Sequence, residues 1–185
     1  MKKLLATLSL TLVSGAAMAH SGHADHSGFV AGAMHTLSGI DHVLTILAVG
    51  FLAARQSTKG RLLASGFLGA LLLGFTVSMW MPAVLAVEHS IIFGLMALGL
   101  VVMYHKGVES LGLLLLVGVL GMSNGLAHGW EVPAGASVVG FATGFLLMSA
   151  TLMLAANVIS RAFRQHYAAL AAGAGLVVSG AILAF

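Results

Sequence analysis

Two histidines and an aspartate stand close together inside an apolar stretch of this chain: His35, Asp41 and His42. Neutral imidazole nitrogens and carboxylate oxygens together bind divalent metals of intermediate softness, such as nickel, cobalt, zinc and copper. Ionisable groups inside a bilayer are costly, so they usually serve a function there. The three residues therefore predict a metal site and not merely a structural polar contact.

The spacing of the two histidines leaves two geometries open. In a straight helix, His35 and His42 would share a face but lie about 10 Å apart along the axis. That separation is long for one ion, because bonds from metal to nitrogen are about 2 Å. Either the two rings mark successive stations, or Ser38 and Gly39 permit a break that brings them together. Asp41 could ligate the metal directly or orient the His42 ring.

Further histidines and acids are expected on the same side of the membrane. Glu88 and His89 begin the third apolar stretch, and His128 with Glu131 ends the fourth. His128 and Glu131 are three residues apart, so in a helix they share one face. The His and Glu pairs that bind metal inside helical bundles also share a face. We therefore expect ligands from three helices to converge, with His89 as an accessory capture residue. The predicted ligands are His35, Asp41, His42, Glu88, His128 and Glu131.

The composition indicates the kind of protein that must position these side chains. Of 185 residues, 59% are hydrophobic and only 7% are charged, and the mean hydropathy is +1.07. These values are typical of a polytopic membrane protein. The weak charge implies no nucleic-acid partner. The absence of cysteine excludes disulfides, thiolate ligands and a cysteine nucleophile.

Six apolar stretches, each near the roughly 20 residues that a helix needs to cross a bilayer, define the predicted fold. The fold class is an all-α membrane protein, a six-transmembrane-helix bundle after an N-terminal signal peptide, with one domain over 29–185. Gly121 and Gly125, and likewise Gly140 and Gly144, have a spacing that lets helices approach closely, although coincidence is an alternative among 24 glycines. The predicted spans are 29–54, 62–86, 89–104, 110–128, 135–158 and 167–185.

The N-terminus carries two predicted segments. Residues 1–19 read as a signal peptide, with Lys2 and Lys3 before an apolar core and a small-residue cleavage site at 17–19; an uncleaved anchor is the alternative. Residues 20–28 form a His-rich external segment, which either captures metal or is only a processed terminus. Its candidate capture residues are His20, His23, Asp25 and His26.

The basic residues predict the orientation, because Lys and Arg favour cytoplasmic loops. Apart from Lys2 and Lys3, they all fall on alternate connections: Arg55, Lys59, Arg61, Lys106, Arg161 and Arg164. We therefore expect a multi-pass protein of the inner (plasma) membrane with both mature termini on the external, periplasmic side. Trp80 and Trp130 would then lie near the outer interface. His105 and His166, beside the basic residues, are assigned an interfacial role.

The residues from His35 to His42 also resemble a known motif, His-Pro-x-x-Gly-x-Asp-His, in the HupE/UreJ family of nickel and cobalt permeases. Thr36 stands where proline is usual, and Gly39 matches the motif's glycine. The family is similar in an acidic residue early in the third span, here Glu88, and in a His-Gly pair followed by Glu, here His128 to Glu131. Phe67 is the positional candidate for a phenylalanine that matters in the family's second span.

The resemblance implies a permease and not an enzyme, with Ni²⁺, or Co²⁺ as the alternative, as transported substrate and no prosthetic group. Gly39 and Phe67 would support the path. Its partners would be the metal ion, the lipid bilayer and downstream nickel-enzyme maturation proteins. The residues alone leave two other interpretations open: an intramembrane zinc hydrolase-like enzyme with a carboxylate as general base, and a membrane metal sensor or delivery protein. The sequence does not define an oligomeric state.

Overall fold

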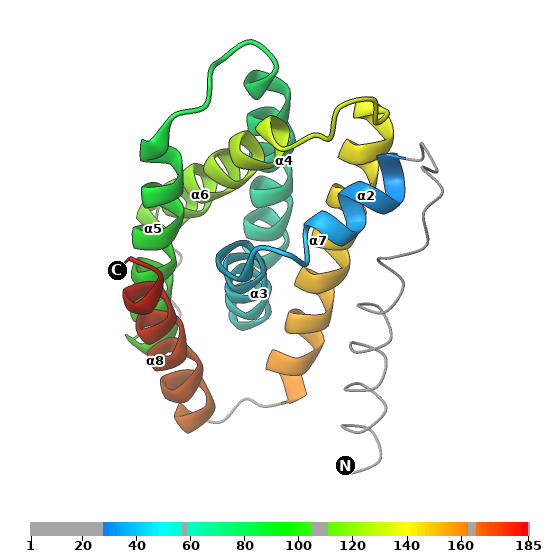
Figure 1. Ribbon diagram of the computed structural model, residues 1–185. Coiled ribbons are helices and arrows are strands. Elements are labelled where there is room, and N and C mark those ends of the chain that lie inside the picture. The colour runs from blue at the N-terminus through cyan, green and yellow to red at the C-terminus, as the bar shows by residue number, and fades with distance from the viewer. Residues whose placement is uncertain (1–27, 57–58, 105–110, 163–165, 185) are drawn as a thin grey trace.

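The computed structural model describes residues 28–56, 59–104, 111–162 and 166–184, and these fold entirely into α-helices and their connections. The all-helical prediction is confirmed for this part of the chain, shown in Figure 1. The helices are α2 (Gly28–His35), α3 (Ile40–Arg55), α4 (Gly60–Ser78), α5 (Leu85–Tyr104), α6 (Leu111–Trp130), α7 (Val138–Ala162) and α8 (His166–Leu183).

Several of these helices are long and apolar enough to cross a membrane. Within the described ranges, α4, α5, α6 and α7 meet this criterion singly, and α2 with α3 meets it as one bent pair. The sixth predicted span corresponds to α8, whose apolar stretch Tyr167–Leu183 is shorter. The chain is therefore a multi-pass helical membrane protein, and the count of six spans stays a prediction. The predicted signal peptide lies outside the described residues.

The helices pack in pairs that are distant in sequence. α4 lies against α6, α5 lies against α8, and both α2 and α3 lie against α7. Phenylalanines from α4 and α7 are among the largest fully buried side chains: Phe67, Phe141 and Phe145. Because lipid tails are as apolar as the side chains, close packing contributes more than the hydrophobic effect to such contacts.

Glycines bring the backbones of α4 and α6 into contact. A Cβ atom at Gly125 would overlap the carbonyl oxygen of Leu71, and one at Gly74 would overlap that of Met122. The predicted close approach at Gly121 is confirmed as well, because a Cβ there would lie 2.6 Å from the Phe67 oxygen. This contact fixes α6, and α6 carries His128 near its C-terminal end.

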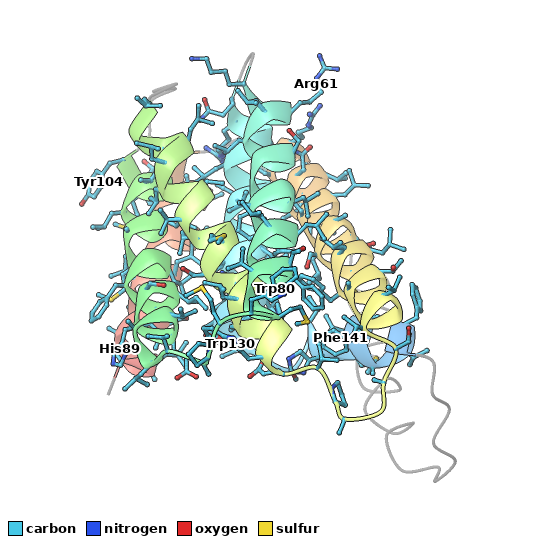
Figure 2. The ribbon with its side chains drawn as sticks, turned by 90° about the horizontal axis from the view of Figure 1, so that it is seen from above. Arg61, Trp80, His89, Tyr104, Trp130 and Phe141 are labelled. Carbon is cyan, nitrogen blue, oxygen red and sulfur yellow. The ribbon has the colours of Figure 1, made fainter. Side chains whose placement is uncertain are left out.

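The two ends of the bundle differ in their polar residues. Figure 2 shows Arg61 and Tyr104 at one end, and His89, Trp130 and Phe141 at the other. The Trp130 indole Nε1 donates a hydrogen bond of 2.8 Å to the Met81 carbonyl, which ties the end of α6 to the connection after α4. The fold thus separates a basic end from an end that carries histidines and acids.

Candidate metal-binding site

A break in the first span is the local feature on which the site depends. α2 ends at His35, α3 begins at Ile40, and the two axes are bent by 79°. Ser38 turns back on α2, since its backbone N–H and its Oγ both donate to the His35 carbonyl, at 3.0 and 2.6 Å. Gly39 is then extended (φ −91°, ψ 108°) and caps α3. Figure 1 shows that α2, in blue, points in a clearly different direction from α3.

Thr36 occupies the turn at the break. Its Oγ1 donates to the Gly32 carbonyl at 3.0 Å, and its side chain is fully buried against α7, 3.5 Å from the Phe145 carbonyl oxygen. A back-bonded threonine can bend a helix. The chain therefore breaks at this point without the proline of the resembling motif.

The break answers the question raised by the spacing of the two histidines. The His128 ring centroid lies 5.2 Å from that of His35 and 4.6 Å from that of His42. Both rings thus reach the same residue of α6 instead of lying two turns apart along one helix. Of the two predicted geometries, the broken helix is the one observed.

A carboxylate joins this group of rings. His35 Nε2 lies 2.7 Å from Glu131 Oε2, within hydrogen-bond distance. Ligand atoms of His35, His128 and Glu131 all lie within 4.8 Å of one another. Two neighbouring ligands of one ion, each bound at about 2.0–2.2 Å, stand roughly 3–3.6 Å apart. The arrangement can therefore hold a divalent metal after small side-chain movements.

All six predicted ligands line one cavity of about 270 Å³ at this end of the bundle. Asp41 and His42 lie on its wall from α3, with Asp41 Oδ1 2.9 Å from His42 Nδ1. Glu88 faces it from the first turn of α5, and is exposed. The full lining is His35, Ser38, Gly39, Asp41, His42, Glu88, Ile92, Ala127, His128 and Glu131. Their role as metal ligands stays a prediction.

Two of the imidazoles have no hydrogen-bond partner among the described residues. This holds for both ring nitrogens of His128, which is 1% exposed, and for both of His42. His42 Nδ1 lies 2.9 Å from Asp41 Oδ1, but the geometry of this contact does not make a hydrogen bond. Buried polar atoms without partners are costly. Coordination of a metal would satisfy them.

The surrounding charges favour a cation. Three carboxylates, Asp41, Glu88 and Glu131, line the cavity. The helix dipoles largely offset one another, because the C-terminal ends of α2 and α6 and the N-terminal ends of α3 and α5 all lie at the cavity. The hydrogen bond with His35 lowers the pKa of Glu131 below its ordinary value of 4.5, although partial burial opposes this shift. Glu131 is therefore an anion at neutral pH.

Some predicted residues lie elsewhere. His89 is exposed on α5 and is not part of the cavity wall; its Nδ1 lies 3.0 Å from the Leu85 carbonyl and its ring stacks on Phe93. Phe67 is buried at the contact of α4 with α6 and does not line the cavity. The predicted capture residues His20, His23, Asp25 and His26 lie outside the described part of the chain.

Two residues that the sequence did not single out form the apolar wall beside the histidines. The Phe145 ring lies 4.9 Å from that of His128, and the Phe141 ring 5.5 Å from that of His35. Phe75 stacks on both phenylalanines. Phe141 and Phe145 are four apart and share a helix face. However, apolar residues in an apolar span carry no signal of their own.

Comparison with known proteins shows the family of the chain. Residues 8–185 match the family model described as HupE / UreJ protein. The chain is 31% identical over 186 residues to Protein HupE from Rhizobium leguminosarum bv. viciae, an alignment that covers 98% of this chain and 96% of that protein. No solved structure gives a significant match. The chain belongs to the HupE/UreJ family.

Proposed function

We propose that this protein takes up a divalent transition-metal ion, Ni²⁺ or alternatively Co²⁺, through a path that begins at the histidine and acid cavity. One observation carries the proposal. Imidazoles and carboxylates from α2, α3, α5 and α6, together with Glu131 beyond α6, surround a single cavity at one end of an apolar helical bundle. The HupE/UreJ family is a family of metal transporters, which agrees with such a site.

The choice of ion depends on the family more than on the donor atoms. Nitrogen and oxygen ligands suit nickel, cobalt, zinc and copper(II), and the order of affinities does not by itself select one of them. The family is associated with nickel and cobalt uptake. We therefore propose nickel as the substrate and cobalt as the alternative, with no prosthetic group.

The ion would enter from the exposed ligands of the cavity towards the buried ones. Glu131, with a side chain 53% exposed, and the exposed Glu88 would attract the hydrated cation. His35 and then the buried His128 and His42 would replace its water molecules one after another. Release on the other side requires a weaker inner site or a rearrangement of the helices.

We also propose the membrane arrangement. α2 with α3 counts as one span and α8 as the sixth, after a cleaved signal peptide over 1–19 and the external segment 20–28. The basic end of the bundle, at Arg55, Lys59 and Arg61, would face the cytoplasm, because positive loops favour that side. Both mature termini and the histidine cavity would then face the outside of the inner membrane.

Uptake of radioactive nickel into liposomes that contain the purified protein tests the proposal. We expect accumulation that cobalt inhibits more strongly than zinc or copper, and that the Asp41→Asn variant loses. Intact cells that express either the wild-type protein or the Asp41→Asn variant provide a second uptake assay. Turnover of a substrate without accumulation would support the enzyme instead. Binding with neither accumulation nor turnover would support a sensor or delivery protein.

A further inference from the structure

Three polar side chains lie fully buried inside the bundle beyond the histidine cavity. They are Thr45 of α3, Asn124 of α6 and Ser149 of α7, each 0% exposed. Within the part of the chain that the structure describes, one oxygen of each has no hydrogen-bond partner: Thr45 Oγ1, Asn124 Oδ1 and Ser149 Oγ. Such oxygens are costly in a membrane interior, where no bulk water satisfies them. Three of them, from three different helices, therefore require an explanation.

Other hydroxyl side chains of the described helices show the usual solution. Thr76, Thr143 and Thr151 are exposed, and each donates to the carbonyl four residues earlier, at 2.7 or 2.8 Å. This bond hides the hydroxyl from lipid. Thr45 and Ser149 make no such bond. Their hydroxyls are thus unpartnered in the interior, while those on the outer surface are satisfied.

The register of α3 and α6 places Thr45 and Asn124 at one depth. The rings of His42 and His128 lie 4.6 Å apart. Thr45 follows His42 by three residues, and Asn124 precedes His128 by four in a helix that runs the opposite way. Each is therefore about one helical turn, or roughly 5 Å, further from the cavity mouth than its histidine.

Ser149 falls at the same level on α7. It follows Phe145 by four residues, and the Phe145 ring packs on His128 at 4.9 Å. α7 also runs alongside α3, since Asn157 Nδ2 donates to the Gly50 carbonyl at 3.4 Å, well beyond this level. The three unpartnered oxygens thus come from three helices whose rings touch at the histidine cavity, His42 of α3, His128 of α6 and Phe145 of α7.

We propose that Thr45, Asn124 and Ser149 form a second, deeper station for the divalent cation, which receives the ion from the histidines and holds it through neutral oxygens with part of its water retained. The inference rests on the proposed function. Asn124 can offer only its carbonyl oxygen, because its Nδ2 already donates to the Leu120 carbonyl at 2.8 Å. The Asn124 carbonyl oxygen and the two hydroxyl oxygens each have lone pairs that can ligate a divalent cation.

The chemistry of this station suits release. Oxygens without charge bind nickel or cobalt more weakly than imidazole and carboxylate do. Conduction requires that an ion be bound well enough to enter and weakly enough to leave. The histidine cavity would supply the first property and the oxygen station the second.

Transport kinetics of variants in liposomes test the station. We expect Asn124→Leu to lower the maximal rate of nickel uptake about tenfold, because one ligand to a charged ion is lost. Nickel binding at equilibrium in detergent should stay close to the wild-type value, since the histidine cavity is intact. Thr45→Val should lower the maximal rate in the same direction, and Thr45→Ser, which keeps the hydroxyl, should restore it.

A stability readout separates the station from a structural role. Thr45→Val removes an unpartnered buried oxygen at nearly constant volume, so its unfolding temperature in detergent should not fall and is expected to rise. Thr76→Val, which removes a hydroxyl bonded to its own helix, is the matched control and should transport as the wild type does. Slower transport together with a lower unfolding temperature for Thr45→Val would overturn the station.

A charge at the same place gives a third test. Asn124→Asp keeps the size of the side chain and adds an anionic ligand, so nickel should bind more tightly and leave more slowly. Wild-type maximal rates in Asn124→Leu, Asn124→Asp and Thr45→Val would overturn the station and leave the proposed uptake intact. Absence of nickel accumulation by the wild-type protein would instead overturn the proposed function.

Discussion

Two cavities at opposite ends of the bundle differ in size and in chemistry. The one at the histidine end measures about 270 Å³ and is lined by imidazoles and carboxylates. The other, of about 660 Å³, lies between α3, α4 and α7, and its polar lining is Gln56, Arg61, Asn157 and Arg161. Figure 2 shows Arg61 at the end opposite His89 and Trp130. The larger cavity is thus not the one with metal ligands.

Among the described residues, the kind of polar group distinguishes the cavities further. In the larger one, Arg161 Nε donates to Asn157 Oδ1 at 2.9 Å, and Asn157 in turn donates to the Gly50 carbonyl. In the smaller one, the ring nitrogens of His42 and His128 have no partner. Guanidinium groups only donate and always carry a positive charge, so they repel a metal ion. Ligand chemistry, not volume, therefore identifies the candidate site.

The largest effect is expected from His128→Ala, which removes the ring on which His35 and His42 converge. Nickel uptake should fall by about 100-fold or more, because even the partners that support a metal ligand are worth about 10–100-fold. Initial rates in liposomes measure this loss. His89→Ala is the matched control, since His89 lies outside the cavity. Wild-type uptake by a correctly inserted His128→Ala protein would show that the smaller cavity is not on the path.

Acidification should produce the next largest effect. Protons compete with metal for imidazole nitrogens, so uptake should decline by about tenfold or more between pH 7 and pH 5. Glu131 does not cause this decline: its pKa is lowered by the hydrogen bond with His35, so the carboxylate stays ionised until the pH falls below its ordinary range. Initial rates at fixed free nickel measure the profile. A flat profile would contradict ligation by histidine.

Glu131→Gln should have a moderate effect. The change removes one anionic ligand, but the side chain is 53% exposed, and screening by water reduces the value of its charge. We expect nickel affinity to fall by about three- to tenfold. Titration of nickel into the detergent-solubilised protein measures it. A loss as large as that of His128→Ala would mean that the carboxylate, not the imidazole cluster, dominates binding.

The smallest effect is expected at the larger cavity. Arg161→Gln removes the positive charge and shortens the side chain, but it keeps an amide N–H that can donate to Asn157. Nickel uptake should change by less than about twofold, as is usual for changes remote from a functional site. Parallel uptake assays with wild type measure the difference. Loss of uptake comparable to that of His128→Ala would remove the functional distinction between the two cavities.

Much of this molecule follows from local sequence. The first predicted span, 29–54, corresponds to α2 and α3 together, which cover 28–55. Apolar stretches predict such helices because a helix that crosses a bilayer must be long and apolar. Length and apolar character are properties of residues that are neighbours in the sequence. The sequence also distinguishes His35, Asp41 and His42, since ionisable groups are rare in apolar stretches.

Other features depended on contacts between distant segments. The sequence left open whether Ser38 and Gly39 break the first span, because both residues are tolerated in straight and in broken helices. In the folded chain, α7 packs on both α2 and α3, and α7 also supplies Phe141 and Phe145 beside the histidines. Neither phenylalanine could be distinguished beforehand, because its role comes from its neighbours and not from its type.

The sequence by itself determined the helical membrane class, the positions of the apolar stretches and the donor types available for a metal, because these depend on composition and on local order along the chain. Only the tertiary structure decided that His35, His42 and His128 meet. It also decided that Thr45, Asn124 and Ser149 are buried and that one oxygen of each has no hydrogen-bond partner among the described residues. The physical reason is that a shared site depends on the 79° bend and on the register of antiparallel helices, and both are set by packing between segments far apart in the chain.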